Sequence, residues 1–362
     1  MRTLRNSPQT RFATGAALFG VTLALGIGAN PAAGASSAHV ARDGNHGYTQ
    51  VNLVSDVPGL AKVTDAHVVN PWGISFGPQT PLWVANNGTA TSTIYAGANG
   101  SGPISTVPLV VDVPEGVTGT VFNDTSRFHV PGTHGTPALF LFDSLGGDIA
   151  AWTSTDPVST AATTVKHVPG AVFTGLTLAR SGDGARLFAA DAAGGVRVYN
   201  GNFHQVDVFR DHHLQGLGLS PYGIQGIGHW IYVTYAPAPG VTAKFDGAVD
   251  VFSPSGNLHR RLITGGKLDD PWGLALAPEH WGKFGGDLLV GNEEDGKINA
   301  YNPRSGDWQG VLSDGKGHPL VNDGLWGIAF GNGVIGTPRK LIFAAGIDEY
   351  AHGLVGTIQP AD

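Results

Sequence analysis

Asn70-Pro71-Trp72-Gly73-Ile74 is a phrase that recurs along this chain of 362 residues. Three close copies of it read Ser220-Pro221-Tyr222-Gly223-Ile224, Asp270-Pro271-Trp272-Gly273-Leu274 and Gly324-Leu325-Trp326-Gly327-Ile328. Two weaker copies fill the gaps between them, at Thr118-Gly119-Thr120-Val121 and Thr174-Gly175-Leu176-Thr177-Leu178. The six copies begin successive units of roughly fifty residues, a period typical of repeat architectures.

Each unit continues in the same way after its phrase. A short apolar strand such as Leu82-Trp83-Val84-Ala85 leads through a polar turn into a second strand such as Ser92-Thr93-Ile94-Tyr95, and a further strand follows. Four strands per unit predict an all-β fold, a six-bladed β-propeller of four-stranded antiparallel blades, with the repeated glycine where inner strands crowd round the axis. The 55 glycines and 23 prolines, with only 14% charged residues, fit short strands joined by tight turns.

The sixth unit is one strand short, because the chain ends soon after Gly353-Leu354-Val355-Gly356-Thr357-Ile358. The missing strand is available at the other end of the repeats, as Tyr48-Thr49-Gln50-Val51-Asn52-Leu53-Val54. Pairing of this N-terminal strand with the last blade would close the ring and complete the four strands of that blade. A seven-bladed ring with one degenerate blade and a β-sandwich are the alternatives, and the regular period disfavours the sandwich.

The N-terminal residues predict export. Arg2, Arg5 and Arg11 precede an apolar run that is followed by small residues, so residues 1–38 are interpreted as a signal peptide cleaved after Ala35 or Ala38. Residues 39–46 are interpreted as a flexible leader and residues 47–362 as the propeller. A retained membrane anchor is the alternative, but glycines interrupt the run and no basic stop-transfer cluster follows it. We therefore expect a secreted protein, extracellular or periplasmic, that is not inserted in a membrane after cleavage.

Charge and cysteine content exclude several functions. The net charge of −7 becomes about −10 once the three arginines of the signal peptide are removed, and no run of lysine or arginine is present. Such a chain is not expected to bind nucleic acid or an anionic membrane. The absence of cysteine excludes disulfides, thiolate zinc sites and a cysteine nucleophile. We expect a monomer held together by its own core.

The loops that lead into the inner strands, and the hairpins after the second strands, should lie together at one mouth of the central channel. A concave mouth with aromatic walls and polar groups is the default ligand site of such a fold. The polar and aromatic residues expected there are Asn70, Asn86, Asn87, Asp143, Asp191, Asp270, Asn292, Glu293, Asp323, Asp348, Glu349, His352, Trp72, Tyr222, Trp272 and Trp326.

Two interpretations exist for the residues of this set that would bind a ligand. Trp72, Tyr222, Trp272 and Trp326 can form a stacking platform for sugars or aromatic ligands, or they can be wedges between neighbouring blades. Asn70 and Asn87 can bind polar ligands, but asparagine before glycine, as in Asn87-Gly88, also favours a tight turn without any ligand.

Asp348-Glu349-Tyr350-Ala351-His352-Gly353 is the most specific local signal in the chain. A carboxylate and an imidazole three residues apart in a tight loop can act as general acid and base, so Glu349 and His352 are the candidate catalytic pair. The alternative is a histidine that hydrogen-bonds a neighbouring blade beside an exposed acid.

Oxygen-bearing side chains near the mouth suggest a divalent cation such as calcium as a cofactor. Asn292 and Asp323 are the candidate ligands. The nearby run Asn292-Glu293-Glu294-Asp295-Gly296 lacks the alternating spacing of an EF-hand loop and also fits a solvated charged hairpin.

The phrases Asn70-Pro71-Trp72-Gly73 and Glu349-Tyr350-Ala351-His352-Gly353 together resemble a family of exported, functionally uncharacterised bacterial propellers. That family is similar in architecture to NHL-repeat propellers and, more distantly, to the gluconolactonase and paraoxonase-like group. The resemblance extends from about residue 48 to residue 360 and implies export and a six-bladed ring, but no established activity. The sequence departs from the family's pattern at Glu293-Glu294, where an aromatic residue and a glycine are more usual.

Two functions from different classes follow from these residues. The first is a binding module that holds a small molecule, glycan or protein at the channel mouth. The second is a metal-dependent enzyme of the lactonase or lyase type, in which His352 transfers a proton, Glu349 orients it and a cation polarises the substrate. Whether the protein is an enzyme is left open by the sequence.

Overall fold

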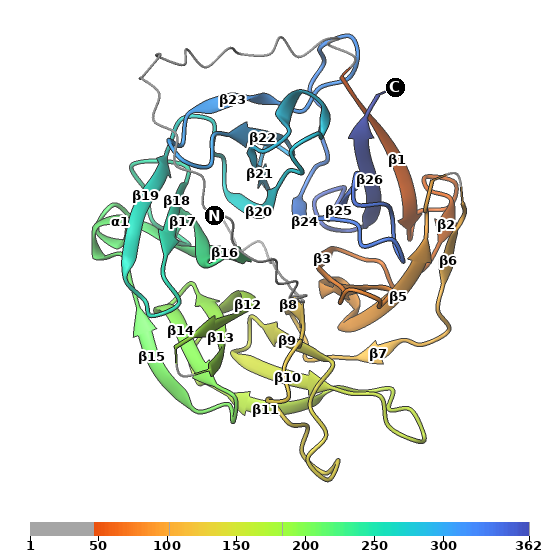
Figure 1. The fold of residues 1–362 in the computed structure, drawn as a ribbon, viewed down its shortest axis with the longest axis vertical. Helices are drawn as coiled ribbons and strands as arrows, with labels where there is room; N and C mark the ends of the chain where they lie inside the picture. Colours follow the sequence, from red (N-terminus) through yellow and green to blue (C-terminus); the bar gives the residue numbers. More distant parts are fainter. Residues whose placement is uncertain (1–46, 101, 183, 362) are drawn as a thin grey trace, which may run out of the picture.

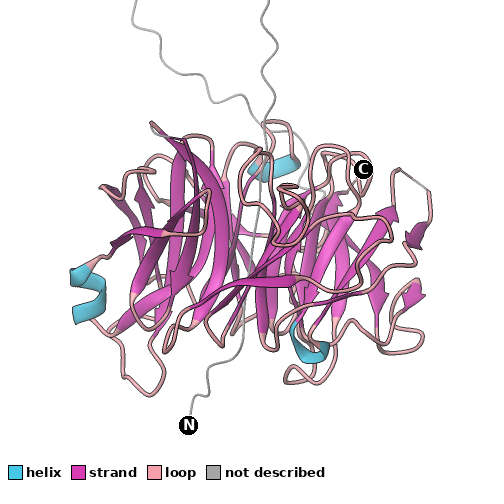
Figure 2. Cartoon of the chain, turned by 90° about the horizontal axis from the view of Figure 1, so that it is seen from below, coloured by secondary structure: helices cyan, strands magenta, loops and turns pink. Residues whose placement is uncertain are grey.

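The computed structural model describes residues 47–100, 102–182 and 184–361, which form a closed ring of six β-sheets around a central axis (Figure 1). The signal peptide and the leader predicted for residues 1–46 lie outside the described residues. Seen from the side, the strands run between two faces on which the loops lie (Figure 2). Among the described residues, no helix is long and apolar enough to span a membrane.

The strands of each blade are ordered in sequence from the axis outward, except that the two outermost strands of blade 6 come from the N-terminal end of the described residues. Blade 1 contains β3 (Pro71–Ser75), β4 (Leu82–Asn86), β5 (Thr91–Gly97), β6 (Ile104–Thr106) and β7 (Val111–Asp112), which also pairs with β5. Blade 2 contains β8 (Val117–Phe122), β9 (Phe140–Ser144), β10 (Asp148–Trp152) and β11 (Thr163–His167). Blade 3 contains β12 (Phe173–Ser181), β13 (Gly184–Asp191), β14 (Gly195–Asn200) and β15 (Gln205–Phe209).

The other three blades follow the same plan. Blade 4 contains β16 (Leu219–Ile227), β17 (Trp230–Pro237), β18 (Ala248–Phe252) and β19 (Leu258–Thr264). Blade 5 contains β20 (Pro271–Leu276), β21 (Leu288–Asn292), β22 (Ile298–Tyr301) and β23 (Trp308–Val311). Blade 6 contains β24 (Leu325–Phe330), β25 (Leu341–Ala345), β26 (Leu354–Pro360), β1 (Tyr48–Ser55) and β2 (Val63–Thr64). Three short helical segments, η1 (Asn87–Thr89), α1 (His212–Gly216) and η2 (Gly282–Phe284), lie in loops.

The ring is closed by the N-terminal strand, as the sequence predicted. Strand β1 pairs antiparallel with β26, from Tyr48 opposite Pro360 to Ser55 opposite Leu354. The residues of β1 that face the core, Tyr48, Leu53 and Val54, are at most 3% exposed. The last blade is therefore built from both ends of the propeller, and β26 is not left as an open edge.

The repeated phrase has a structural meaning beyond its glycine. In all six inner strands the pairing with the second strand shifts register at the phrase, which is a β-bulge at an equivalent place in each blade. A Cβ added at Gly223 would lie 2.2 Å from the carbonyl oxygen of Trp272, and one at Gly273 would lie 2.4 Å from that of Trp326. Each of these two glycines lets the backbone of the next blade approach the inner strand closely.

The phrase also defines the two ends of the channel. All six inner strands begin at the phrase, and we call the end of the channel where they begin the first mouth and the end where they finish the second mouth. Between the two mouths, Ile74, Ile224, Leu274 and Ile328 surround a void of about 10 Å³, which is close to the size of one water molecule.

Candidate functional site

Aromatic residues of the repeated phrase gather at the first mouth. Trp72, Tyr222, Trp272 and Trp326, from blades 1, 4, 5 and 6, form one buried cluster in which no residue is more than 7% exposed. The ring centroids of Trp72 and Trp326 are 4.9 Å apart, and those of Trp272 and Trp326 are 6.4 Å apart in an edge-to-face arrangement. The four rings pack on one another where four blades meet. Their assignment as ligand-binding residues stays a prediction.

Two asparagines predicted for the ligand site connect blades at this mouth. Asn70 Oδ1 accepts hydrogen bonds from the indole nitrogens of Trp72 at 2.6 Å and Trp326 at 3.0 Å, and thus joins blade 1 to blade 6. Asn87 Nδ2 donates to the carbonyl oxygen of Val117 at 2.9 Å and joins blade 1 to blade 2. Both amide side chains therefore connect neighbouring blades at the first mouth.

The loop from Ile347 to Gly353 adds an aromatic residue that the sequence analysis did not select. Asp348, Glu349 and Tyr350 have φ values of 54°, 52° and 69°, so three consecutive residues other than glycine occupy the left-handed region. Such conformations cost about 1–3 kcal/mol each and persist only where the surroundings enforce them. The result is that the Tyr350 ring stacks on Trp326, with centroids 5.7 Å apart, and the Tyr350 hydroxyl donates a hydrogen bond to Glu293.

Three carboxylates converge beside this tyrosine. The oxygen atoms that Asp270, Glu293 and Glu294 could offer to a metal ion lie within 4.8 Å of one another. Asp270 and Glu293 are 9% and 1% exposed, whereas Glu294 is exposed to solvent. The Tyr222 hydroxyl lies 3.5 Å from Glu293 Oε2, so tyrosines from blades 4 and 6 both contact this buried carboxylate of blade 5.

Backbone hydrogen bonds hold the loops that carry the carboxylates. Glu293 N donates to the carbonyl oxygen of Asp270 at 2.9 Å, and Glu294 N donates to that of Asp269 at 3.4 Å. The loop before β20 and the hairpin after β21 are thereby tied to each other, and Asp270 has a left-handed φ of 47°. Carboxylate oxygens in a fixed group are the ligands that hard cations such as Ca²⁺ prefer.

The two residues predicted as metal ligands are not members of this group of three carboxylates. Asn292 is fully buried, and its Nδ2 donates to the carbonyl oxygen of Lys267 at 2.8 Å and to Asp295 Oδ1 at 3.1 Å. Asp323 is exposed and is not one of the three clustered carboxylates. No bound ion tests either residue, and their assignment as metal ligands stays a prediction.

His352 has a carboxylate partner that is distant in sequence. Its Nδ1 lies 2.6 Å from Asp56 Oδ2, and Gly353 N donates to Asp56 Oδ1 at 2.8 Å. The hydrogen bond to Asp56 and the charge of that carboxylate raise the pKa of His352 above its ordinary value. Glu349, its predicted partner, is exposed. The catalytic assignment of Glu349 and His352 stays a prediction, and Asp56 is a further candidate for orienting the imidazole.

Asp56→Asn is expected to lower the pKa of His352 towards its ordinary value, because it removes the carboxylate charge and keeps a hydrogen-bonding side chain of the same size. Glu349→Gln serves as the matched control and should leave the His352 titration where it is. The measurement is the pH titration of the imidazole nitrogens by NMR in the three proteins. A larger shift in the Glu349 variant than in the Asp56 variant would contradict this pairing.

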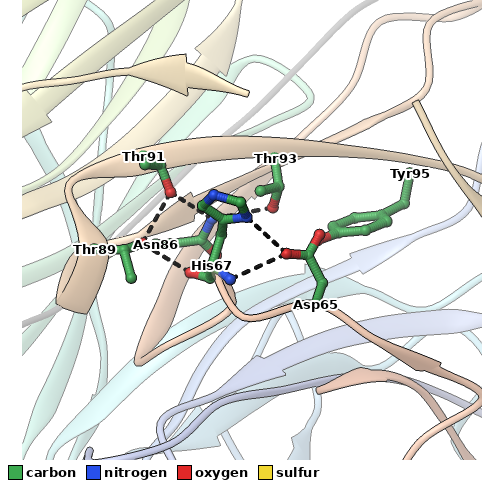
Figure 3. A network of polar contacts seen from close by, with 7 residues as sticks. All are labelled: Asp65, His67, Asn86, Thr89, Thr91, Thr93 and Tyr95. Atoms are coloured by element: carbon green, nitrogen blue, oxygen red, sulfur yellow. Dashed lines mark hydrogen bonds and ion pairs between the residues drawn. The ribbon is translucent and has the colours of Figure 1, made fainter. Parts of the chain in front are cut away.

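A second histidine and aspartate pair lies in the segment that leads from β2 into β3 (Figure 3). Asp65 Oδ1 lies 2.8 Å from His67 Nδ1, and the Tyr95 hydroxyl donates to Asp65 Oδ2 at 2.7 Å. Partial burial raises the pKa of Asp65, but hydrogen bonds from Tyr95 and His67 outweigh it and the net pKa is lowered. Asp65 N in turn donates to the carbonyl oxygen of Ser55, the residue before Asp56.

Threonines complete this network. Thr89 Oγ1 donates to the carbonyl oxygen of His67 at 2.8 Å and lies 2.9 Å from Thr91 Oγ1, and Asn86 Nδ2 donates to Thr91 and Thr93 (Figure 3). The polar groups of the turn and of the β4–β5 hairpin are thus bonded to one another. The network connects the β4–β5 hairpin of blade 1 to the segment that leads to Asn70.

The fold and the first mouth define a six-bladed β-propeller with a buried aromatic cluster and a carboxylate group at one end of its channel. The sequence is 32% identical over 330 residues to the uncharacterized protein R648 of Acanthamoeba polyphaga mimivirus, a match that covers 84% of this chain and 78% of R648. The chain belongs to the same family as R648. The uncharacterized protein L690 of the same virus is 29% identical over 329 residues, which cover 84% of each chain.

Comparison with solved structures supports the fold alone. A streptogramin B lyase structure superimposes with a TM-score of 0.52 at 12% sequence identity, over 87% of this chain and 97% of the lyase chain. No family model matches the sequence. The relatives described above are viral, so the predicted resemblance to a bacterial family stays a prediction.

Proposed function

We propose that this protein is a binding module whose ligand site is the first mouth, and that it holds a divalent cation there through Asp270, Glu293 and Glu294. The observation that carries the proposal is the convergence of three carboxylates from two bonded loops within 4.8 Å. Asp270 and Glu293 are buried, and Glu293 contacts the hydroxyl groups of Tyr222 and Tyr350. The bound cation would then recruit a polar small molecule or a glycan.

Calcium is the cation that these residues fit best. Ca²⁺ takes about six to eight oxygen ligands in flexible geometry, and three carboxylates supply only part of that set. The remaining positions suit hydroxyl or carboxylate oxygens of a ligand approaching from the solvent side, where Glu294 is exposed.

Glu293→Gln is expected to weaken calcium binding about 100-fold, which corresponds to about 2.7 kcal/mol, because it removes the central charge of the cluster and retains the shape of the side chain. Glu279→Gln is the matched control, since Glu279 is exposed in the loop between β20 and β21 at the other end of the inner strand. Calcium titration calorimetry and the calcium-dependent rise in melting temperature measure the effect.

Two results would overturn the cation proposal. The first is a wild-type protein that gives no calorimetric heat and no thermal shift with calcium at millimolar concentration. The second is equal calcium affinity in Glu293→Gln and Glu279→Gln. Binding that is retained in the control and lost in the Glu293 variant assigns the site to the first mouth.

An enzyme of the lactonase or lyase type is the second candidate, and the His352–Asp56 pair favours it. An imidazole held through Nδ1 by a carboxylate has its Nε2 oriented for proton transfer, as general acid–base catalysis requires. The same loop carries Tyr350 to Glu293, and this mechanism requires that one substrate reach both His352 and a cation held by the carboxylates. Turnover of lactones that requires both calcium and His352 would establish the enzyme, and ligand binding without turnover favours the module.

We further propose that the protein acts outside the cytoplasm as a monomer. The support is the N-terminal pattern of arginines, apolar run and small residues, and the net charge of −7, which does not suit a nucleic-acid partner. Protein sequencing of the N-terminus of the mature protein from the culture medium or the periplasm would test export, and an N-terminus at Met1 would contradict it.

A further inference from the structure

A second concave site lies at the other end of the channel. A cavity of about 470 Å³ opens at the second mouth, among the last residues of the inner strands β12, β16, β20 and β24. Its volume falls in the range of about 300–1,000 Å³ that is typical of small-molecule sites. This cavity lies at the opposite end of the inner strands from the carboxylates of the first mouth.

The walls of the cavity are mainly apolar. Its apolar lining includes Leu178, Ala185, Ile227, Leu274, Leu276 and Phe330. Leu276 is 45% exposed although it ends an inner strand, and it is one of the most exposed large apolar side chains of the described residues. Apolar surface that stays in contact with water inside a concave site is a source of binding free energy for an apolar ligand.

An ion pair borders this apolar surface. Arg180 and Asp124 both line the cavity, with Arg180 Nη2 2.8 Å from Asp124 Oδ2. A guanidinium group carries five N–H donors, and the ion pair with Asp124 uses one of its nitrogens. The remaining donors can bind a carboxylate in the two-pronged geometry that suits arginine. His229 and Gln225 add further polar groups to the same wall.

We propose that the second mouth is a separate binding site for an amphipathic carboxylate, whose apolar chain or ring contacts Leu276 and Phe330 and whose carboxylate is bound by Arg180. The site is independent of the cation site at the first mouth, because the two lie at opposite ends of the inner strands. Octanoate has the required chemistry, with one carboxylate and a flexible apolar chain, and serves as the probe.

Leu276→Asp tests the apolar part of the site. The substitution places a negative charge among the apolar walls and is expected to weaken octanoate binding at least about ten-fold in titration calorimetry of the full chain. Leu258→Asp is the matched control, because Leu258 is 44% exposed on the outer strand β19, away from the cavity. The control should bind octanoate as the wild-type protein does.

Arg180→Gln tests the charged part. It removes the guanidinium group at a position whose side chain is 64% exposed, so the fold is retained, and it should weaken octanoate more than octanol, which has the same chain without a carboxylate. The proposal is overturned if the wild-type protein shows no saturable octanoate binding up to about 10 mM. Equal weakening by Leu276→Asp and Leu258→Asp would overturn it as well.

Calcium binding separates this proposal from the one for the first mouth. Leu276→Asp and Arg180→Gln should both keep the calcium affinity of the wild-type protein, and Glu293→Gln should keep its octanoate affinity. A protein that binds octanoate but not calcium supports the second-mouth site and rejects the cation site, and the reverse result does the opposite.

Discussion

Val54→Asp is expected to unfold the propeller or to lower its free energy of unfolding by more than about 4 kcal/mol. Val54 lies in the closing strand β1, opposite Val355 of β26, and is completely buried in the core between blades 6 and 1. An aspartate there loses the burial of the valine side chain and introduces a carboxylate into an apolar cluster. Loosening of β1 would also leave β26 as an open edge, so the ring should lose its closure.

Val51→Asp is the control for the closing strand. Val51 lies on the same strand opposite Thr357 and is 37% exposed, so an aspartate at this position should change the unfolding free energy by less than about 1 kcal/mol. Urea unfolding followed by tryptophan fluorescence measures both variants. If Val54→Asp cost no more than Val51→Asp, the closing strand would contribute little to the stability of the ring.

The sequence could predict this closure because each inference rested on a short stretch of sequence. Six copies of one phrase gave the number of blades, and a single strand left over at Tyr48 to Val54 matched a single strand missing after Ile358; both predictions are confirmed. The bulge at each phrase was not predicted. A register shift depends on the pairing of two strands, and the sequence of one strand does not display it.

The candidate site was predicted in part. Asp270 and Glu293 were placed at one mouth with the phrase residues, because the loops that carry them begin or end equivalent strands. Asp56 was missed as the partner of His352, since the two residues are 296 positions apart and lie near opposite ends of the propeller's sequence. Contacts between distant segments follow from ring closure, and a short motif such as Glu349 to Gly353 cannot show them.

Tyr350 and the second mouth were missed for a different reason. The position of Tyr350 depends on three consecutive residues in the left-handed conformation. Because residues other than glycine disfavour this conformation, it could not be predicted from the sequence. Half of the residues that line the cavity at the second mouth are Leu, Ala, Ile or Phe, which look like ordinary core residues in a sequence. Its functional signal is the exposure of Leu276, which appears only once the ring is built.

The stability of this protein is expected to fall as the pH rises from about 4 to about 7, and Asp143 is the main reason. Asp143 is fully buried; its Oδ1 accepts hydrogen bonds from Thr118 Oγ1 at 2.8 Å and Gly119 N at 2.6 Å, while its Oδ2 has no hydrogen-bond partner among the described residues. Burial raises its pKa from 3.8 to about 7, although the hydrogen bonds oppose the shift.

The sign of the effect follows from proton linkage. Between the unfolded pKa of 3.8 and the folded pKa of about 7 the folded protein binds the extra proton, so raising the pH through this window favours the unfolded state. A shift of this size corresponds to a loss on the order of 4 kcal/mol by pH 8. Burial likewise raises the pKa of Asp250 to about 7, which acts in the same direction, although Arg261 Nε lies 3.5 Å from Asp250 Oδ1 and favours the charged form.

Asp143→Asn should remove the part of this pH dependence that Asp143 contributes. The amide mimics the protonated carboxyl group in shape and charge, and its oxygen can accept the hydrogen bonds of Thr118 and Gly119. The variant is therefore expected to match the wild-type protein near pH 5 and to exceed its free energy of unfolding near pH 8, as measured by urea unfolding at both pH values. Asp207→Asn, at an exposed position of β15, should retain the wild-type pH dependence. If the wild-type protein and Asp143→Asn showed the same change in unfolding free energy between pH 5 and pH 8, Asp143 would not contribute to the pH dependence.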